Sequence, residues 1–256
     1  MKFRPCIDIH DGAVKQIVGG SLDDNAGVAE NYVAEKGGDY YANMYKQSGL
    51  KGGHIIILNK YGTAEYEASL FQAKAALAAY PGGMQIGGGV TAENAADFIS
   101  YGASHVIVTS YVFRDGMLDM DRLKGLLDAV GREHIVLDLS CRKDNGRYFI
   151  VTDRWQKFTD VEVSPEKMRF LSDYCAEILV HGVDVEGKQQ GIDIELLSIL
   201  AACKDIKITY AGGIHSMADI EVIDTIGGGM IDFTVGSALD IFGGSLSYKE
   251  LASEYC

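Results

Sequence analysis

The sequence predicts a single α/β domain folded as a (β/α)8 barrel, and three observations lead to this fold class. The chain has 256 residues, a length at which such barrels form one domain. Eight short apolar runs alternate with segments of helical spacing. Similar motifs recur about 130 residues apart, which favours a closed barrel of two like halves over an open doubly wound sheet. We therefore predict one domain over 1–256, with half-barrel repeats of approximately 1–130 and 131–256.

The predicted strands have nearly continuous Ile, Val and Leu content instead of an apolar–polar alternation. This composition is typical of parallel strands that helices cover on both sides. In chain order the strands are expected at 5–9, 54–58, 84–86, 105–109, 134–139, 177–181, 206–210 and 231–235, of which 84–86 has the weakest signal.

Helices are expected between these strands. Apolar residues between 66 and 77 step by four, three and four, which predicts a helix packed on one side. Ser216 and Asp219 have the spacing of a helix start. The glycines at 227–229 indicate a helix end.

Two insertions interrupt the alternation, each after the carboxyl end of a strand. The first is about 25 residues long and precedes a helix expected near Asp39; we predict a short strand pair within it. The second contains Asp144, Asn145 and Gly146 between strand-like flanks, which predicts a hairpin. Barrels carry their chemistry on this face, so both insertions are expected beside the site.

Charge and cysteine content exclude several partners. The chain has 23 Lys and Arg against 36 Asp and Glu, a net charge of −13 that disfavours nucleic acid and anionic membranes. No segment has the apolar length of a membrane helix. The five cysteines are widely spaced and have no disulfide or zinc-like spacing, so we expect a cytoplasmic chain without a metal.

Asp8 and Asp138 are the candidate catalytic residues. Each lies at the end of an apolar strand, where a charged carboxylate pointing into the core would be costly, so both are expected to face a cleft. If the halves are related by an approximate twofold axis, the two come from opposite walls and can act as general acid and base. The alternative is that each accepts backbone or Lys/Arg hydrogen bonds at a strand end.

Two glycine–serine sets are candidate phosphate sites. The sets are Gly88 and Gly89 with Ser110, and Gly212 and Gly213 with Gly236 and Ser237. Glycine lets the backbone approach a phosphate, and the next helix start is expected to supply N–H groups. Two such sites predict a ligand with a phosphate at each end, although ordinary tight turns are the alternative. Gly19 and Gly20 are predicted to add donors to one phosphate.

Other residues of the same face have weaker signals. His181, followed by Gly182, and His10 are placed to hydrogen-bond a substrate, or to serve as structural histidines. Trp155 could stack on a flat ring of the ligand, or it could pack against neighbouring side chains of the protein. Basic residues of the two insertions are hypothesised to assist anion capture or to be solvated surface: Lys15, Arg142, Lys143 and Arg154.

Several motifs together resemble the phosphoribosylformimino-5-aminoimidazole carboxamide ribotide isomerase family of histidine biosynthesis. These motifs are RPCIDIHDGAVKQIVGG, IGGGV, VLDLS, VHGVDVEGKQQGID, YAGGI and VGSAL. The resemblance covers essentially the whole chain and is greatest for the branch of eukaryotes and some bacteria. It implies a (β/α)8 barrel of two half-repeats that uses neither metal nor organic cofactor.

The resemblance also implies an Amadori rearrangement of a bisphosphorylated aminoaldose to an aminoketose. The carboxylate matching Asp138 would be the general acid that helps open the ribose ring, and that matching Asp8 the general base at C2. The two glycine–serine sets would hold the terminal phosphates. We expect a monomer whose partner is this small-molecule bisphosphate.

The chain departs from the bacterial pattern of the family at three places. The bacterial DLD is Leu58, Asn59 and Lys60 here, the Arg after GGGI is absent, and the Thr after the sixth strand is Gly182. The partner of the ribose is therefore open, and His181 or Asp184 is the hypothesis.

Three alternative functions stay open at this point. The cyclase subunit of imidazole glycerol phosphate synthase is a sister barrel with similar phosphate motifs. A non-catalytic barrel could bind a phosphorylated ligand as a sensor or scaffold, which the presence of both aspartates disfavours. An isomerase of this kind could also accept phosphoribosylanthranilate.

Overall fold

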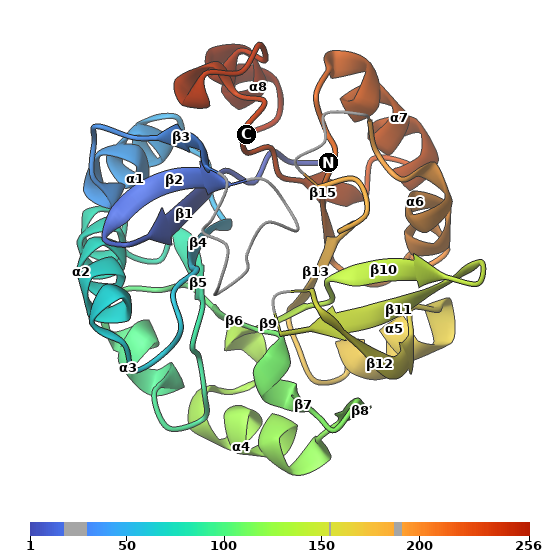
Figure 1. Ribbon diagram of the computed structural model, residues 1–256. Helices are drawn as coiled ribbons and strands as arrows, with labels where there is room; N and C mark the ends of the chain where they lie inside the picture. The colour runs from blue at the N-terminus through green and yellow to red at the C-terminus, as the bar shows by residue number, and fades with distance from the viewer. Residues whose placement is uncertain (18–29, 154, 187–190) are drawn as a thin grey trace.

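Eight parallel strands form a closed barrel in the computed structural model, which describes residues 1–17, 30–153, 155–186 and 191–256 (Figure 1). They are β1 (Cys6–His10), β4 (Gly53–Ile57), β5 (Met84–Gly87), β6 (Val106–Val108), β9 (Ile135–Asp138), β13 (Glu177–His181), β14 (Ile208–Ala211) and β15 (Ile231–Phe233). Each pairs in parallel with the next. A parallel bridge between Phe3 and Phe233 joins the first to the last, with the Arg4 N–H donating to Phe233 O at 2.8 Å. The predicted barrel is therefore confirmed over the open sheet.

The α-helices form a ring around the barrel (Figure 1). Those described are α1 (Gly38–Gln47), α2 (Ala64–Ala79), α3 (Ala95–Ser100), α4 (Met120–Val130), α5 (Pro165–Ser172), α6 (Ile194–Ala201), α7 (Met217–Gly227) and α8 (Tyr248–Glu254). Helix α2 buries Tyr66, Ala73 and Leu77 of the predicted stripe. Short 3-10 helices are η1 (Ser110–Val112), η2 (Arg132–His134) and η3 (Asp240–Phe242). None of the described helices is long and apolar enough to cross a bilayer.

Both insertions contain the predicted strands. In the first, β2 (Ala13–Ile17) pairs antiparallel with β1 and with β3 (Glu30–Val33). In the second, β10 (Cys141–Asp144), β11 (Arg147–Thr152) and β12 (Lys157–Glu162) form an antiparallel sheet. Asn145 and Gly146 both have positive φ, 47° and 81°, as a tight hairpin turn requires. A third, two-residue pair is β7 (Phe113–Arg114) with β8 (Met117–Leu118).

The interior of the barrel is filled at its amino-terminal end and open at the other. Inward-facing side chains step by two along each strand. An apolar layer lies in the middle and consists of Ile107, Val136, Leu179 and Ala211, with Ile56 packed against it. Beneath it, the buried carboxylate of Glu177 accepts hydrogen bonds from Thr209 Oγ1 at 2.6 Å and Gln85 Nε2 at 3.0 Å. These layers leave the carboxyl ends of the strands as the place for a cavity.

Candidate active site

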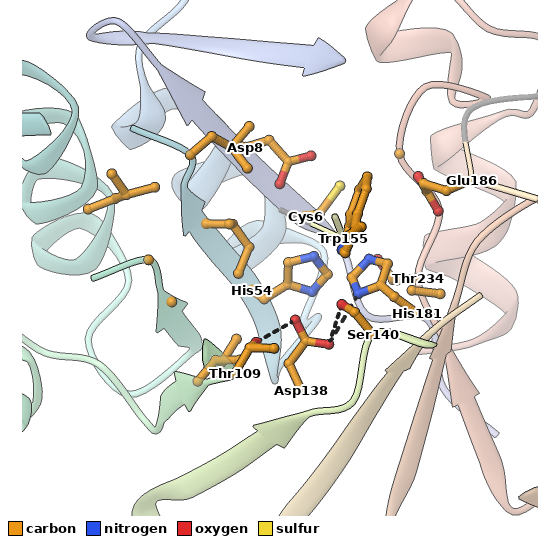
Figure 2. A pocket seen from close by; sticks show the side chains of 18 of the residues that line it. Cys6, Asp8, His54, Thr109, Asp138, Ser140, Trp155, His181, Glu186 and Thr234 are labelled. Atoms are coloured by element: carbon orange, nitrogen blue, oxygen red, sulfur yellow. Dashed lines mark hydrogen bonds and ion pairs between the residues drawn. The ribbon is translucent and has the colours of Figure 1, made fainter. Parts of the chain in front are cut away.

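A cavity of about 550 Å³ lies at the carboxyl ends of the strands. Residues in or just after all eight barrel strands line it. Figure 2 shows carboxylates, imidazoles, a thiol and an indole gathered around one space. Barrels of this class place their reactive groups at this end.

Asp8 and Asp138 face this cavity from opposite walls. Asp8 is on β1 and Asp138 ends β9, and these strands are four positions apart in the eight-stranded ring. Both side chains point toward the shared space in Figure 2. The structure therefore places the two aspartates as the sequence predicted.

Asp138 lies among hydrogen-bond donors. Its carboxylate accepts from Thr109 Oγ1 at 3.0 Å and from Ser140 Oγ at 3.1 Å, and its Oδ1 lies 3.5 Å from His181 Nδ1. Burial alone would lower the pKa of His181, but the hydrogen bond and charge of Asp138 outweigh it and raise that pKa to about 9. His181 is therefore protonated at neutral pH. The Trp155 ring lies 6.3 Å from the His181 ring, centroid to centroid.

Asp8 has a contrasting environment. Burial and the nearby charge of Glu186 raise its pKa to about 7, against the opposing effects of His181 and Gln16. The Gln16 amide donates a hydrogen bond to Asp8 Oδ2 at 3.4 Å. Asp8 is therefore ready to exchange a proton near neutral pH.

Sequence reasoning missed several residues of this cavity, among them Cys6, His54 and Glu186. His54 is the second residue of β4, and the alternation of side chains along that strand turns it inward, as it does Ile56 two residues later. Its burial lowers its pKa to about 4, so the ring is neutral. Glu186 follows β13, and burial raises its pKa. HIIIL has no alternation of polar and apolar residues, so it carried no signal for the direction of His54, and Glu186 lay in a motif quoted without a role.

The two glycine–serine sets line the cavity on opposite sides. One set follows β5 and β6, the other follows β14 and β15, again four strands away around the ring. Gly88 has a φ of 99°, and a Cβ there would lie 2.1 Å from Ile57 O. Gly212 has a φ of 115°, and a Cβ there would lie 2.8 Å from Gly182 O. Any side chain is excluded at both positions, which leaves bare backbone at the cavity wall.

The predicted contribution of the next helix start stays a prediction for the second set. The Ser216 hydroxyl accepts the Asp219 N–H at 3.3 Å, and the Asp219 carboxylate accepts the Ser216 N–H at 2.9 Å. This capping box occupies the Ser216 and Asp219 N–H groups at the start of α7 and places a negative charge there. In the first set, Ser110 itself begins a helix, the short η1.

Several weaker predictions lie away from the cavity. Gly182 does not line it, and neither do His10, Lys15, Arg142, Lys143 or Asp184. Asp184 instead accepts hydrogen bonds from Arg142 Nε at 3.1 Å and from the Lys143 N–H at 2.8 Å, so His181 is the one of the two ribose candidates that faces the cavity. Gly19, Gly20 and Arg154 lie outside the described residues.

Comparison with known proteins gives concordant matches over nearly the whole chain. The family model described as histidine biosynthesis protein matches residues 2–246. The chain is 54% identical to the chloroplastic 1-(5-phosphoribosyl)-5-((5-phosphoribosylamino)methylideneamino)imidazole-4-carboxamide isomerase of Medicago truncatula, over 99% of this chain and 81% of the relative. Isomerases of the same name from Neurospora crassa and Saccharomyces cerevisiae are 43% and 41% identical, over 95% and 96% of this chain and 93% and 94% of theirs.

Proposed function

The chain belongs to the histidine biosynthesis protein family, and on this premise we propose how its cavity performs the reaction for which its relatives are named. The chain is an isomerase that acts on the aminoaldose for which its relatives are named, 1-(5-phosphoribosyl)-5-((5-phosphoribosylamino)methylideneamino)imidazole-4-carboxamide, here called ProFAR. An Amadori rearrangement converts ProFAR to the corresponding aminoketose, here called PRFAR. This substrate has a phosphate at each end and the reacting ribose between them. The observation that carries the proposal is that Asp8 and Asp138 face each other between the two glycine–serine sets, which also lie on opposite sides of the cavity. These two sets are called the glycine cradles below.

Asp138 and His181 form the acid side of the site. Opening the ribose ring breaks the bond between C1 and the ring oxygen, which must gain a proton, and leaves a protonated imine. The His181 imidazolium supplies that proton, and the Asp138 carboxylate 3.5 Å away orients and stabilises it. The acid role assigned to Asp138 from the resemblance is thus shared with its histidine neighbour.

Asp8 is the base on the opposite wall. Its ionised carboxylate takes the proton from C2, and the electron pair released forms an enolamine that tautomerises to the ketone. A base is most effective when its pKa lies near the working pH, which the value of about 7 for Asp8 satisfies. The unlike environments of the two aspartates separate the acid from the base.

The glycine cradles hold the ends of the substrate. Their backbone lines opposite sides of the cavity, so a bisphosphate that spans them places its ribose between Asp8 and Asp138. Backbone N–H groups suit phosphate in a chain with a net charge of −13, because they need no basic side chain.

Substrate turnover tests this function. Purified protein given ProFAR without ammonia or glutamine should form the ketose, as followed by chromatography, whereas a cyclase would form nothing under these conditions. Phosphoribosylanthranilate in a parallel assay tests whether a second aminoaldose is accepted. Absence of ketose from folded protein would contradict the isomerase function.

We further propose that the chain works as a monomer in a reducing compartment such as the cytoplasm. All five cysteines are unpaired, and only Cys256 is exposed, as is typical of a reducing environment. Sedimentation at micromolar concentration checks the oligomeric state: a dimer mass would contradict it.

A further inference from the structure

Cys6, Asp8 and His54 converge at one place on the cavity wall (Figure 2). The register of β1 and β4 pairs Cys6 directly with His54, and Asp8 lies two residues further along the inward face of β1. The thiol sulphur, a carboxylate oxygen and an imidazole nitrogen all lie within 4.8 Å of one another. Two adjacent strands of the barrel therefore fix all three donors.

We propose that Cys6, Asp8 and His54 bind a divalent transition metal of the zinc class, and that the bound metal inhibits the isomerase. The inhibition rests on the proposed function, because the metal takes the carboxylate of Asp8 that acts as base. Sulphur, nitrogen and oxygen donors from three residues are a set that Zn²⁺ accepts, with its fourth position left to water. That position opens into the cavity.

The distances suit a tetrahedral ion after a small contraction. Metal–ligand distances of about 2.0 to 2.3 Å put tetrahedral ligands about 3.3 to 3.8 Å apart. Donors separated by at most 4.8 Å reach this geometry with shifts of about 1 Å, which side-chain rotation supplies. Cys6 and His54 are only 3% and 4% exposed, so little bulk water competes for them.

Charge balance and neighbouring groups also suit the ion. On binding, the Cys6 thiol releases its proton to solvent, and the resulting thiolate and the Asp8 carboxylate together neutralise the two positive charges. A neutral cluster has a smaller desolvation cost than a lone ion in a buried site. The Gln16 amide, 3.4 Å from Asp8 Oδ2 and 3.9 Å from Cys6 Sγ, can orient both ligands.

Metal binding is measured first, without any assay of turnover. Metal-free protein is dialysed to equilibrium against zinc buffered by a chelator, and bound zinc is counted by elemental analysis. We expect one zinc per chain, and at least about a 10-fold weaker affinity in Cys6→Ser. Cys175→Ser, which changes a buried cysteine outside the cavity, and Cys256→Ser, which changes the exposed one, should bind zinc as the wild type does.

Cobalt provides a spectroscopic readout of the thiolate ligand. Co²⁺ bound by wild-type protein should give a thiolate-to-metal charge-transfer absorption that Cys6→Ser lacks and Cys256→Ser retains. Zinc binding unchanged in Cys6→Ser, loss of zinc in Cys256→Ser, or cobalt bound without the thiolate absorption would each overturn the site.

Inhibition is then measured on ProFAR turnover, with each variant compared with its own metal-free rate. Wild-type activity should fall as zinc saturates the dialysis-defined site and return when chelator is added, and Cys6→Ser should need at least about 10-fold more zinc for the same loss. Full activity at saturating zinc would overturn the inhibitory role. A metal-free protein without turnover would instead contradict the proposed function, and the dialysis result would stand independently.

Discussion

Asp8 and Asp138 are the same side chain in two unlike surroundings. Asp138 accepts hydrogen bonds from two hydroxyls and faces a protonated histidine, whereas Asp8 is desolvated and lies near a second carboxylate. In the proposed mechanism, these environments give the two aspartates opposite roles in proton transfer.

Removing either carboxylate should abolish most of the activity. Asp8→Asn and Asp138→Asn each remove one proton-transfer partner but keep the shape of the site, so kcat should fall by at least about 10²-fold. KM should change little, because the glycine cradles hold the substrate. Steady-state kinetics on ProFAR check this, and wild-type turnover in either variant would refute the role given to that residue.

The pH dependence of kcat/KM should be bell-shaped. Asp8 must be ionised to act as base, so activity should rise as the pH passes about 7, and His181 must be protonated, so activity should fall above about 9.

Two neighbours should move the acidic limb of this profile in opposite directions. Glu186→Gln removes a negative charge that raises the pKa of Asp8, so the limb should shift to lower pH. Gln16→Leu removes a hydrogen bond that lowers this pKa, so the limb should shift to higher pH. Profiles of both variants that coincide with the wild type would contradict the base assignment.

The sequence predicted those residues of the cavity whose side chains are unusual for their position in the chain. A carboxylate at the end of an apolar strand, as at Asp8, is conspicuous in the sequence. His54 and Glu186 were not predicted, because their place in the cavity depends on which face of β4 turns inward and on the path of the chain after β13.

The loops that follow the strands are the elements that, in the proposed mechanism, hold the two phosphates. Their glycine turns were predictable, since repeated glycine at strand ends indicates positive φ and bare backbone. The N–H groups that each turn presents were less predictable: the capping box at Ser216 and Asp219 was itself predicted, and it occupies two N–H groups at the start of α7. A local sequence pattern therefore predicts where a turn lies better than it predicts which N–H groups of that turn face the cavity.

Gly88→Ala, which adds a methyl group, should distort the backbone of the glycine cradle that contains Gly88. In Gly88→Ala the Cβ meets the Ile57 carbonyl oxygen, and the left-handed backbone adds strain of about 1 to 2 kcal/mol. Gly82→Ala is the matched control, because Gly82 has a φ of 70° but no atom within 4 Å of a new Cβ. Gly88→Ala should lose more unfolding free energy than Gly82→Ala in urea titrations, and it alone should raise KM. Equal effects of the two substitutions would contradict the close contact.

The whole barrel depends on a polar layer at the end opposite the site. Glu177 binds Lys207 at 2.7 Å as well as Thr209 and Gln85. Arg4 and Asp232, joined by a hydrogen bond of 2.8 Å from Nε, link the residues on either side of the barrel closure. The predicted strands and their order follow from the apolar runs, but this layer was not predicted, since isolated Glu and Gln residues within strands give no sign of their mutual contact.

Glu177→Gln should destabilise the folded protein by about 1 to 3 kcal/mol, because it removes a charged acceptor from buried donors. Glu35→Gln, on an exposed loop residue, should change stability little. Urea unfolding of both variants checks this.

The effect of Glu177 should also depend on pH. Burial would raise the pKa of Glu177, but the charges of Lys207 and Arg4 outweigh it and lower it below the unfolded value of 4.5. The stabilisation is therefore complete above that value and is lost as the pH falls through the folded pKa. The difference between wild type and Glu177→Gln should narrow in acid, and a constant difference would contradict the ion pair.

The two cradles face each other across the cavity and consist of the same kind of backbone, so each can grip either terminus of a doubly phosphorylated molecule. A substrate can accordingly bind with its two phosphates exchanged between the cradles, which displaces its reactive ribose from the proton donor. The two walls nevertheless differ: Trp155 and the protonated His181 lie beside Asp138, whereas the histidine beside Asp8, His54, is neutral. This difference gives the site a polarity, so we expect a substrate bound in the reversed orientation to act as a competitive inhibitor and not to react.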